Sequence, residues 1–371
     1  MDFDLINSVF RILFAFFFSF KLFYTLKAIE LNFLNRDLAI AKINLIILFI
    51  LKIFIFFGFY ASLSAFLMFF IQRYIYYRIL MYTLEDVYFH TATVFLILAN
   101  TSNFYALNNH QLFNFDNFLP YYALVIGVGA TFFSASIAKF KDKIWHNGKA
   151  IFFFFTLPYR RRIDFRKISF FSNLHFTKFL GKFQIALQLI LLPACLLMPK
   201  EIALLIALIN LIFCFVLVVF FHFLWLAELC FVMILTICFG IYLNENGSIF
   251  FQLIQNIELN LDSNNIAKII LLILTFTLIT QPIINFFDPK NKYICKLNLF
   301  LFKLNRITFG LVPIKVFTAL HIENPLIFKM RYKFSKYKSK SIEVFKLYKD
   351  DGTINYKWIG VKPTLFSALT Y

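Results

Sequence analysis

The sequence predicts an all-α polytopic membrane protein with about eight transmembrane helices and a small basic C-terminal lobe outside the membrane that contains a β-hairpin. The first observation is composition: 61% of the 371 residues are hydrophobic and only 15% are charged, against about 45–50% and 25% in soluble domains. The second is the arrangement of the 56 phenylalanines in long apolar runs such as INLIILFILKIFIFFGFYASLSAFLMFFI from Ile43. About 20 such residues in a helix cross a bilayer, so these runs predict membrane spans.

The apolar runs place spans near residues 6–25, 43–71, 87–107, 118–138, 183–199 and 266–287. A further run at 202–243 has 42 residues. As one helix it would be about 63 Å long, twice the hydrocarbon thickness. It contains no Gly or Pro before Gly240, so it is either two spans that turn near His222 to Glu228 or one long tilted helix.

Basic residues are concentrated in two segments outside these runs. Residues 139–182 hold eleven basic and two acidic residues, net +9, and residues 313–371 hold eleven basic and four acidic residues, net +7. The loop at 244–265 has three acidic residues and no basic one. Loops on the side of synthesis are rich in Lys and Arg, so both basic segments are expected on one side. Two spans within 202–243 satisfy this expectation and give eight spans, with both termini on the positive side.

Four parts follow from this organisation. They are N-terminal transmembrane helices in 1–138, a basic loop in 139–182, C-terminal transmembrane helices in 183–288, and an interfacial segment with a basic tail in 289–371. In the last part, Lys296, Lys303 and Arg306 interrupt KLNLFLFKLNRITFGLVPIKVF at intervals that fit a helix lying in the membrane interface. Further on, SIEVFKLYKDDGTINYKWIGVK alternates apolar and polar residues on both sides of the DDG at 350–352, which predicts the hairpin.

Small residues stand four apart in the run 118–138, at Gly127, Thr131 and Ala135. Lipid removes the hydrophobic drive for helix association, and faces of small residues let two backbones approach closely enough for van der Waals packing to replace it. These three residues are therefore predicted to form a helix-packing face, with their helix central in the bundle.

Ionisable residues inside spans are costly and are therefore candidates for function, here proton handling. The candidates are Lys52 in the second run, Asp86 and His90 four residues apart in the third, and His222 and Glu228 near the proposed turn. Each has a structural interpretation as well, because a long lysine can extend to the interface and residues at span ends are solvated there. Glu228 would lie deep in the membrane only if its run is one helix.

The sequence contains no motif for catalysis, metal binding or a redox cofactor. No phosphate-binding loop, GxGxxG, HExxH or GxSxG occurs, and the six histidines are too scattered for paired haem ligands. The five cysteines stand singly and are predicted to be buried apolar side chains: Cys195, Cys214, Cys230, Cys238 and Cys295. We therefore predict no catalytic activity of the chain's own, no metal, and no cofactor other than bound phospholipid such as cardiolipin.

The strongest polar cluster is PYRRRIDFRK, which supplies Arg160, Arg161, Arg162, Arg166 and Lys167. Arginine beside aromatic residues suits phosphate headgroups, so anionic lipid binding is predicted here, with an ordinary positive loop as the alternative. The tail RYKFSKYKSK suits lipid, an acidic partner subunit or, as a lesser alternative, ribosomal RNA. DNA is not a predicted partner.

Several features together resemble the divergent reading frames of ciliate mitochondrial genomes. They are the Phe runs FFFSF and AIFFFF, few Gly and Ala, the basic tail, and a start, MDFDLINSVFRIL, without a basic presequence. The resemblance is compositional and covers the whole chain. It implies a multi-pass subunit of an oxidative phosphorylation complex in the mitochondrial inner membrane, with the basic loop and tail facing the matrix.

The leading hypothesis is a non-catalytic structural subunit of a respiratory-chain complex that packs against other membrane subunits, with cytochrome c oxidase preferred. The run HFLWLAEL from His222 is faintly similar to a histidine-bearing segment of the third subunit of that oxidase, although another span follows it. The alternatives are a proton-conducting or transporter subunit, including the membrane part of ATP synthase, and an assembly factor that docks the ribosome. No Arg lies between Arg166 and Arg306, where the membrane arginine of ATP synthase subunit a would be expected.

Overall fold

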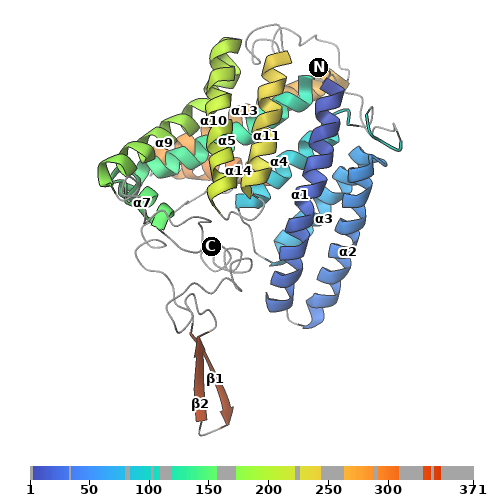
Figure 1. Ribbon diagram of the computed structural model, residues 1–371, viewed down its shortest axis with the longest axis vertical. Helices are drawn as coiled ribbons and strands as arrows, with labels where there is room; N and C mark the ends of the chain where they lie inside the picture. Colours follow the sequence, from blue (N-terminus) through green and yellow to red (C-terminus); the bar gives the residue numbers. More distant parts are fainter. Residues whose placement is uncertain are drawn as a thin grey trace.

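Helices make up most of the described chain, which in this computed structural model comprises residues 3–32, 35–79, 84–101, 104–108, 118–156, 173–221, 226–243, 263–287, 291–308, 329–335 and 338–343. In order they are α1 (Phe3–Asn32), α2 (Asn35–Phe57), α3 (Ala61–Ile79), α4 (Leu84–Leu98), α5 (Phe118–Lys141), α6 (Lys143–His146), α7 (Lys149–Thr156), α9 (Leu174–Leu197), α10 (Lys200–Phe220), α11 (Leu226–Leu243), α13 (Ser263–Phe287) and α14 (Lys292–Thr308). Two antiparallel strands follow, β1 (Lys329–Ser335) and β2 (Lys338–Glu343) (Figure 1).

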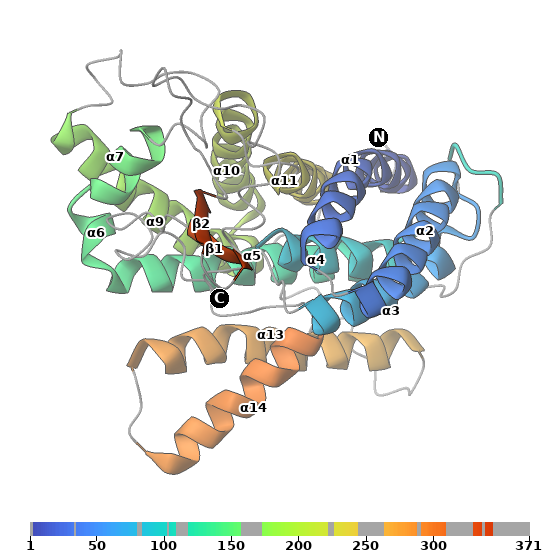
Figure 2. The same cartoon turned by 90° about the horizontal axis from the view of Figure 1, so that it is seen from below.

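Six helices of the described chain are long and apolar enough to cross a membrane: α1, α5, α9, α10, α11 and α13. The structure therefore supports a multi-pass helical membrane protein, whereas the predicted count of eight spans is not confirmed. Helices α1, α10 and α11 run side by side, and α5 and α13 cross them (Figure 2). Membrane helices tilt by about 20° on average and by up to about 40°, so crossing layers fit one bilayer when they tilt in opposite directions.

The predicted single span at 43–71 is wrong, because the chain reverses direction within it. Helix α2 ends at Phe57, α3 begins at Ala61, and the two helices pack against each other. Gly58 in the turn has φ +69°, a left-handed conformation that costs glycine little because it has no Cβ. A single glycine is a weak turn signal inside 29 residues of apolar sequence, which suit one tilted span equally well.

Two other predicted spans end or begin elsewhere. The span expected at 87–107 corresponds to α4, which ends at Leu98, and residues 104–108 after it are not helical. The span expected from 183 corresponds to α9, which begins at Leu174, where the Asn173 side chain accepts a hydrogen bond from the backbone N–H of His175. The basic segment 139–182 thus contains α6, α7 and the first turns of α9 rather than only a loop.

The long run at 202–243 forms two helices. Helix α10 ends at Phe220 and α11 begins at Leu226, and the two pack against each other. Residues 222–225 between them lie outside the described part of the chain. The positive-inside argument and the apolar length together therefore favoured the arrangement that the structure adopts.

The hydrophobic core surrounds α5. This helix packs against α4, α9, α11 and α13, and 72% of the residues in its apolar span are buried. A second, smaller cluster lies beside it, where Trp145 of α6 packs with Ile151 of α7 and Ile185 of α9. Helix α5 therefore connects the two halves of the chain.

The two ends of α5 gather different parts of the chain. At its start, the Tyr121 hydroxyl donates to Asn7 in the second turn of α1 (3.1 Å). At its end, Lys141 Nζ donates to the carbonyl oxygen of Asn285, near the end of α13 (2.6 Å). The acidic first turn of α1 therefore lies at the end of α5 opposite the basic segment 139–182.

The hairpin predicted around 350–352 lies outside the described residues and is not confirmed. The strands that the structure describes come earlier, with Lys329 opposite Glu343. This pair of strands projects away from the helices in Figure 1.

Candidate functional site

Arg11 of α1 is the most completely buried charged residue in the described part of the chain, with a side chain 0% exposed. Its Nη1 donates to the carbonyl oxygens of Ile55 and Phe56, both at 2.8 Å. Its Nη2 donates to those of Phe104 (3.2 Å) and Tyr105 (2.7 Å). The planar fork of a guanidinium suits this paired geometry. Arg11 thereby joins α1, the end of α2 and the segment after α4.

The end of α2 explains why a cation is stable there. Ile55 and Phe56 lie in the last turn of α2, where carbonyl groups lack partners within the helix. The same turn carries the negative end of the helix dipole, which favours a positive charge. A Cβ on Gly58 would lie 2.6 Å from Arg11 Nη1, so the turn depends on glycine. Arg11 therefore caps α2 and closes its turn into α3.

Two further polar side chains extend this site along the same face of α1. Asn7 Nδ2 donates to the carbonyl oxygen of Asn100 (3.1 Å), and the Ser8 hydroxyl donates to that of Thr101 (3.2 Å). Both acceptors lie just after α4 ends, where the backbone is no longer satisfied by a helix. Asn7, Ser8 and Arg11, which we call the Arg11 cluster, therefore hold the non-helical segment against α1.

Lys139 is another buried cation, near the other end of α5, and its side chain is 4% exposed. Its Nζ donates to Gln188 Oε1 of α9 at 2.7 Å. The same Nζ lies 4.7 Å from the centre of the Trp145 ring of α6, within the range of a cation–π interaction. Lys139 therefore ties α5 to α9 and to the small cluster around Trp145.

Hydroxyl and amide groups make similar links along α13. The Tyr122 hydroxyl of α5 lies 2.9 Å from Thr275 Oγ1. The Thr277 hydroxyl donates to Asn305 Oδ1 of α14 (2.8 Å), and Asn305 Nδ2 donates back to the Thr277 carbonyl oxygen (3.0 Å). Polar groups that bridge helices in this way avoid an unsatisfied donor or acceptor in hydrocarbon.

The small residues predicted to form a packing face are all buried in α5. Gly127 lies directly against Thr91 of α4, and a Cβ on this glycine would meet the Thr91 side chain, including its Oγ1 at 2.8 Å. The Thr131 hydroxyl donates to the Gly127 carbonyl oxygen of its own helix (2.7 Å). Ala135 is 6% exposed. Close backbone approach is thus observed at Gly127, toward α4.

Three of the predicted proton-handling residues have described side chains, and they lie on three different helices. His90 of α4 is fully buried, with its ring 5.1 Å from that of Phe69. Lys52 of α2 is half-buried, with Nζ 5.3 Å from the centre of the Phe49 ring. Glu228 is half-buried in the first turn of α11, where the positive end of the helix dipole favours a carboxylate.

The other predicted site residues lie outside the described part of the chain. His222 falls in the gap between α10 and α11. The side chain of Asp86 is not described, although its backbone belongs to α4. The predicted lipid-binding cluster falls entirely within the gap at 157–172: Arg160, Arg161, Arg162, Arg166 and Lys167.

The cysteines divide into two environments. Cys195, Cys214, Cys230 and Cys238 are buried in the core on α9, α10 and α11, as expected for small apolar side chains. Cys295 on α14 is exposed, which differs from the prediction. Among the residues that the structure describes, no three His, Cys, Asp or Glu side chains come together in a way that would hold a metal ion.

Arg11 and Lys139 were not identified as site residues from the sequence. Arg11 stands in an apolar run with Asn7 and Ser8 on the same helix face, and this polar face was the available signal. Lys139 was counted only as a loop charge, because it ends the apolar run. The hydrogen-bond partners of both cations lie 44 to 94 residues away in the chain. Comparisons with protein-family models, curated proteins and solved structures find no match to this chain.

Proposed function

We propose that this chain is a non-catalytic structural subunit of a membrane complex, and specifically of a mitochondrial respiratory-chain complex, with cytochrome c oxidase as the first candidate. One observation carries the structural role: both Arg11 and Lys139 hold helices together. A cation that carried substrate or protons would need to exchange its partners. Arg11 instead contacts four backbone carbonyl groups at once, and Lys139 is enclosed by Gln188 and Trp145.

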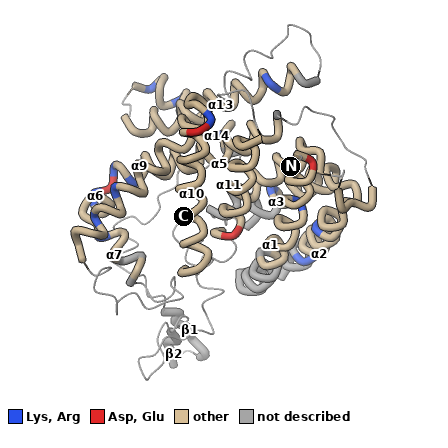
Figure 3. Tube along the Cα trace, turned by 45° about the horizontal axis from the view of Figure 1, so that its top comes forward, with Lys and Arg blue, Asp and Glu red and all other residues tan. Residues whose placement is uncertain are grey.

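The outer surface supports a subunit that packs against others. Helix α10 has a mean hydropathy of 3.2, yet only 22% of its residues are buried within this chain. Its exposed face carries large apolar side chains: Ile202, Leu205, Leu208, Ile212, Phe215 and Val219. Helix α10 is uncharged after Glu201, as its uniform colour shows (Figure 3). Such a face suits acyl chains or the membrane helices of a larger complex.

The compartment and orientation rest on composition and charge. The abundance of Phe and the scarcity of Gly and Ala resemble ciliate mitochondrial reading frames, which favours the inner membrane. The positive-inside rule then places the basic segments 139–182 and 313–371 on the matrix side. The start of α1 belongs on the opposite side, because Asn7 contacts the start of α5. Bound anionic phospholipid such as cardiolipin fits the net charge of +18.

The test of this function is to find where the native chain resides. Membranes of the source cells are extracted with a mild detergent, their complexes are separated on a native gel, and each band is examined by mass spectrometry. Stoichiometric presence in one respiratory complex after ribosome removal is the expected result. Recovery only as a free protein, or only with ribosomes, would overturn the proposal in favour of a transporter or an assembly factor.

The orientation has its own test, which uses the exposed Cys295 of α14 and an introduced cysteine at Leu107. Leu107 is 74% exposed in the segment that Arg11 holds. The full chain is expressed in a bacterial inner membrane, either as it is or as Leu107→Cys with Cys295→Ser. A membrane-impermeant maleimide should label the two positions from opposite sides. Labelling of both from one side would contradict the proposed orientation, in which the start of α1 lies on the side opposite the basic segments.

A further inference from the structure

Helix α14 presents three distinct faces. Leu301 and Asn305 are 6% and 1% exposed and face α13, where Asn305 bonds to Thr277. At about 100° per residue, Lys292, Lys296 and Lys303 fall within about 40° of one another on the opposite side of the helix. All three lysines are exposed. The helix therefore carries a basic stripe that points away from the protein.

An apolar flank lies beside the basic stripe. Tyr293, Phe300 and Ile307 recur every seven residues and are 80%, 61% and 65% exposed. At about 100° per residue, this flank is centred about 60° from the centre of the lysine stripe. Leu299, 53% exposed, borders the stripe on its other side, about 20° from Lys292. On a surface that faces water, these apolar side chains would be exposed to solvent. A helix at the boundary between lipid headgroups and acyl chains combines a basic stripe with an apolar flank in this way.

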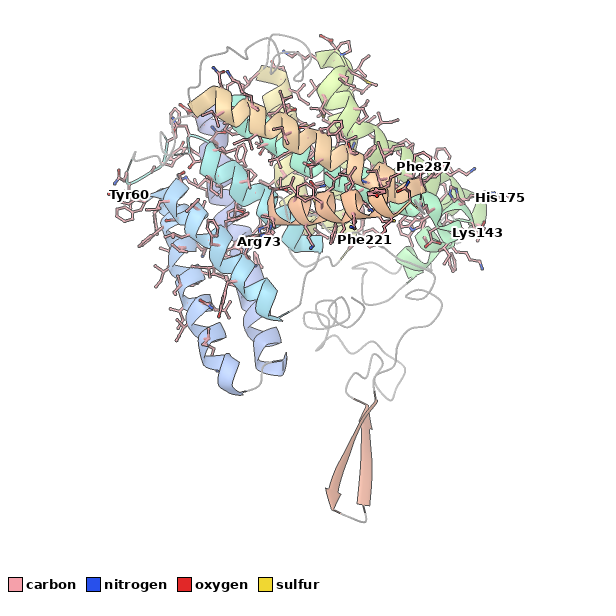
Figure 4. All side chains as sticks on the ribbon, turned by 180° about the vertical axis from the view of Figure 1, so that it is seen from behind. Tyr60, Arg73, Lys143, His175, Phe221 and Phe287 are labelled. Carbon is pink, nitrogen blue, oxygen red and sulfur yellow. The ribbon has the colours of Figure 1, made fainter. Side chains whose placement is uncertain are left out.

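The contacts of α14 place it along the second half of α13 and against α3. In its first half, Asn298 Nδ2 donates to Asn285 Oδ1 (2.7 Å), and the Asn285 carbonyl oxygen accepts from Lys141 at the end of α5. Near its end, the Ile307 carbonyl oxygen accepts a hydrogen bond from Arg73 in the second half of α3. Figure 4 shows α14 beside α13, with Phe287 close to one end and Arg73 close to the other. It therefore bridges the second halves of α13 and α3.

We propose that α14 lies in the plane of the membrane and binds anionic phospholipid. Lys292, Lys296 and Lys303 contact the phosphate groups, while Tyr293, Phe300 and Ile307 enter the acyl region. The inference rests on the proposed membrane role but not on which complex contains the chain. It assigns lipid binding to a segment distinct from the arginine cluster at 160–167.

Cys295 provides the probe, because it is exposed beside the lysine stripe while the four cysteines in the core are buried. The full-length protein is labelled at Cys295 with an environment-sensitive fluorophore and reconstituted into phosphatidylcholine vesicles with a rising fraction of phosphatidylglycerol. The emission should shift to shorter wavelength as the anionic fraction rises. The shift should weaken in high salt, because salt screens exposed charges.

A triple variant, Lys292→Gln, Lys296→Gln and Lys303→Gln, tests the basic stripe. A lysine near an anionic surface changes the binding constant by about fivefold, so the variant should need several times more phosphatidylglycerol for half of the shift. The matched control removes the same charge from exposed lysines elsewhere: Lys149→Gln, Lys178→Gln and Lys182→Gln. The control should respond like the unchanged protein.

Three results would overturn the proposal. One is an equal response to neutral and anionic vesicles, and another is an equal loss in both triple variants. The third is a label that stays in water in every vesicle, which would assign the face to a soluble acidic partner. All three are read on isolated protein, so they are independent of the native-gel result. Membership of a complex can therefore fail while lipid binding stands, or the reverse.

Discussion

Helices α5 and α10 show that the most apolar helix of this protein is not its core. Helix α10 has a mean hydropathy of 3.2 with 22% of its residues buried, and α5 has a mean hydropathy of 1.7 with 72% buried. In a soluble protein the more apolar of the two helices would be the more buried one. In a membrane the exterior is as apolar as leucine, so lower hydropathy marks helices whose small and polar groups meet other helices.

The contrast extends to the charged residues. Arg11 and Lys139 are almost completely buried and bridge helices, whereas Lys52 of α2 is only half-buried. If polar contacts hold the interior together, their loss should cost stability, while changes on the outward faces should not. Four experiments test this contrast, each in detergent unless stated otherwise.

The largest effect is expected for Arg11→Leu. The variant removes the donor to the carbonyl groups of Phe56, Phe104 and Tyr105, at about 1–3 kcal/mol for each unsatisfied group, partly offset by removal of a buried charge. Ile55 keeps the backbone N–H of Gly58 as a donor (3.1 Å). The free energy of unfolding should fall by about 3–5 kcal/mol in a denaturant titration. Lys52→Leu is the control and should change it by less than about 1 kcal/mol. Equal losses of unfolding free energy in Arg11→Leu and Lys52→Leu would show that the hydrogen bonds of Arg11 do not stabilise the fold.

Gly127→Leu should have the next largest effect, because Thr91 of α4 occupies the space that a side chain would need. Overpacking of this kind costs about 1–3 kcal/mol, and one turn of α4 must move to accommodate it. The control is Leu205→Phe on α10, which enlarges a side chain that is 58% exposed. A thermal unfolding scan of both variants decides the matter, and a stable Gly127→Leu protein would argue against close α4–α5 packing.

The Lys139–Gln188 pair is expected to contribute less, because the loss of a buried charge offsets the loss of its hydrogen bond. In a double-mutant cycle, Lys139→Met and Gln188→Leu should show a coupling free energy of about 1–2 kcal/mol. The double variant should regain much of the stability that Lys139→Met loses. The same cycle with exposed Lys149→Met in place of Lys139→Met should give a coupling near zero. Additive effects of Lys139→Met and Gln188→Leu would mean that their contact contributes nothing.

The smallest change in stability is expected on the outward face of α10. Ile212→Ser with Phe215→Ser should alter the unfolding free energy of the isolated protein by no more than about 0.5 kcal/mol. In native membranes the same variant should lose co-migration with the complex if this face contacts another subunit. Phe179→Ser with Phe183→Ser, which are 61% and 46% exposed on α9, is the matched control. Retained co-migration would assign the α10 face to lipid.

Much of the fold could be predicted from apolar length and charge. The run at 202–243 was too long for one crossing, and the balance of basic and acidic loops required two spans, as observed for α10 and α11. The reversal at Gly58 was missed, since 29 apolar residues suit one tilted span and one glycine specifies little. That turn depends on Arg11, which binds carbonyl groups 44 and 45 residues further along the chain.

The sequence by itself determined the environment of this protein, because apolar length and charge balance act locally and can be counted. It also pointed to α5 as a packing helix through Gly127, Thr131 and Ala135. Only the tertiary structure decided which polar groups hold the helices together. The cost of a buried charge depends on the carbonyl groups and side chains that surround it, and for Arg11 and Lys139 the hydrogen-bond partners come from distant segments.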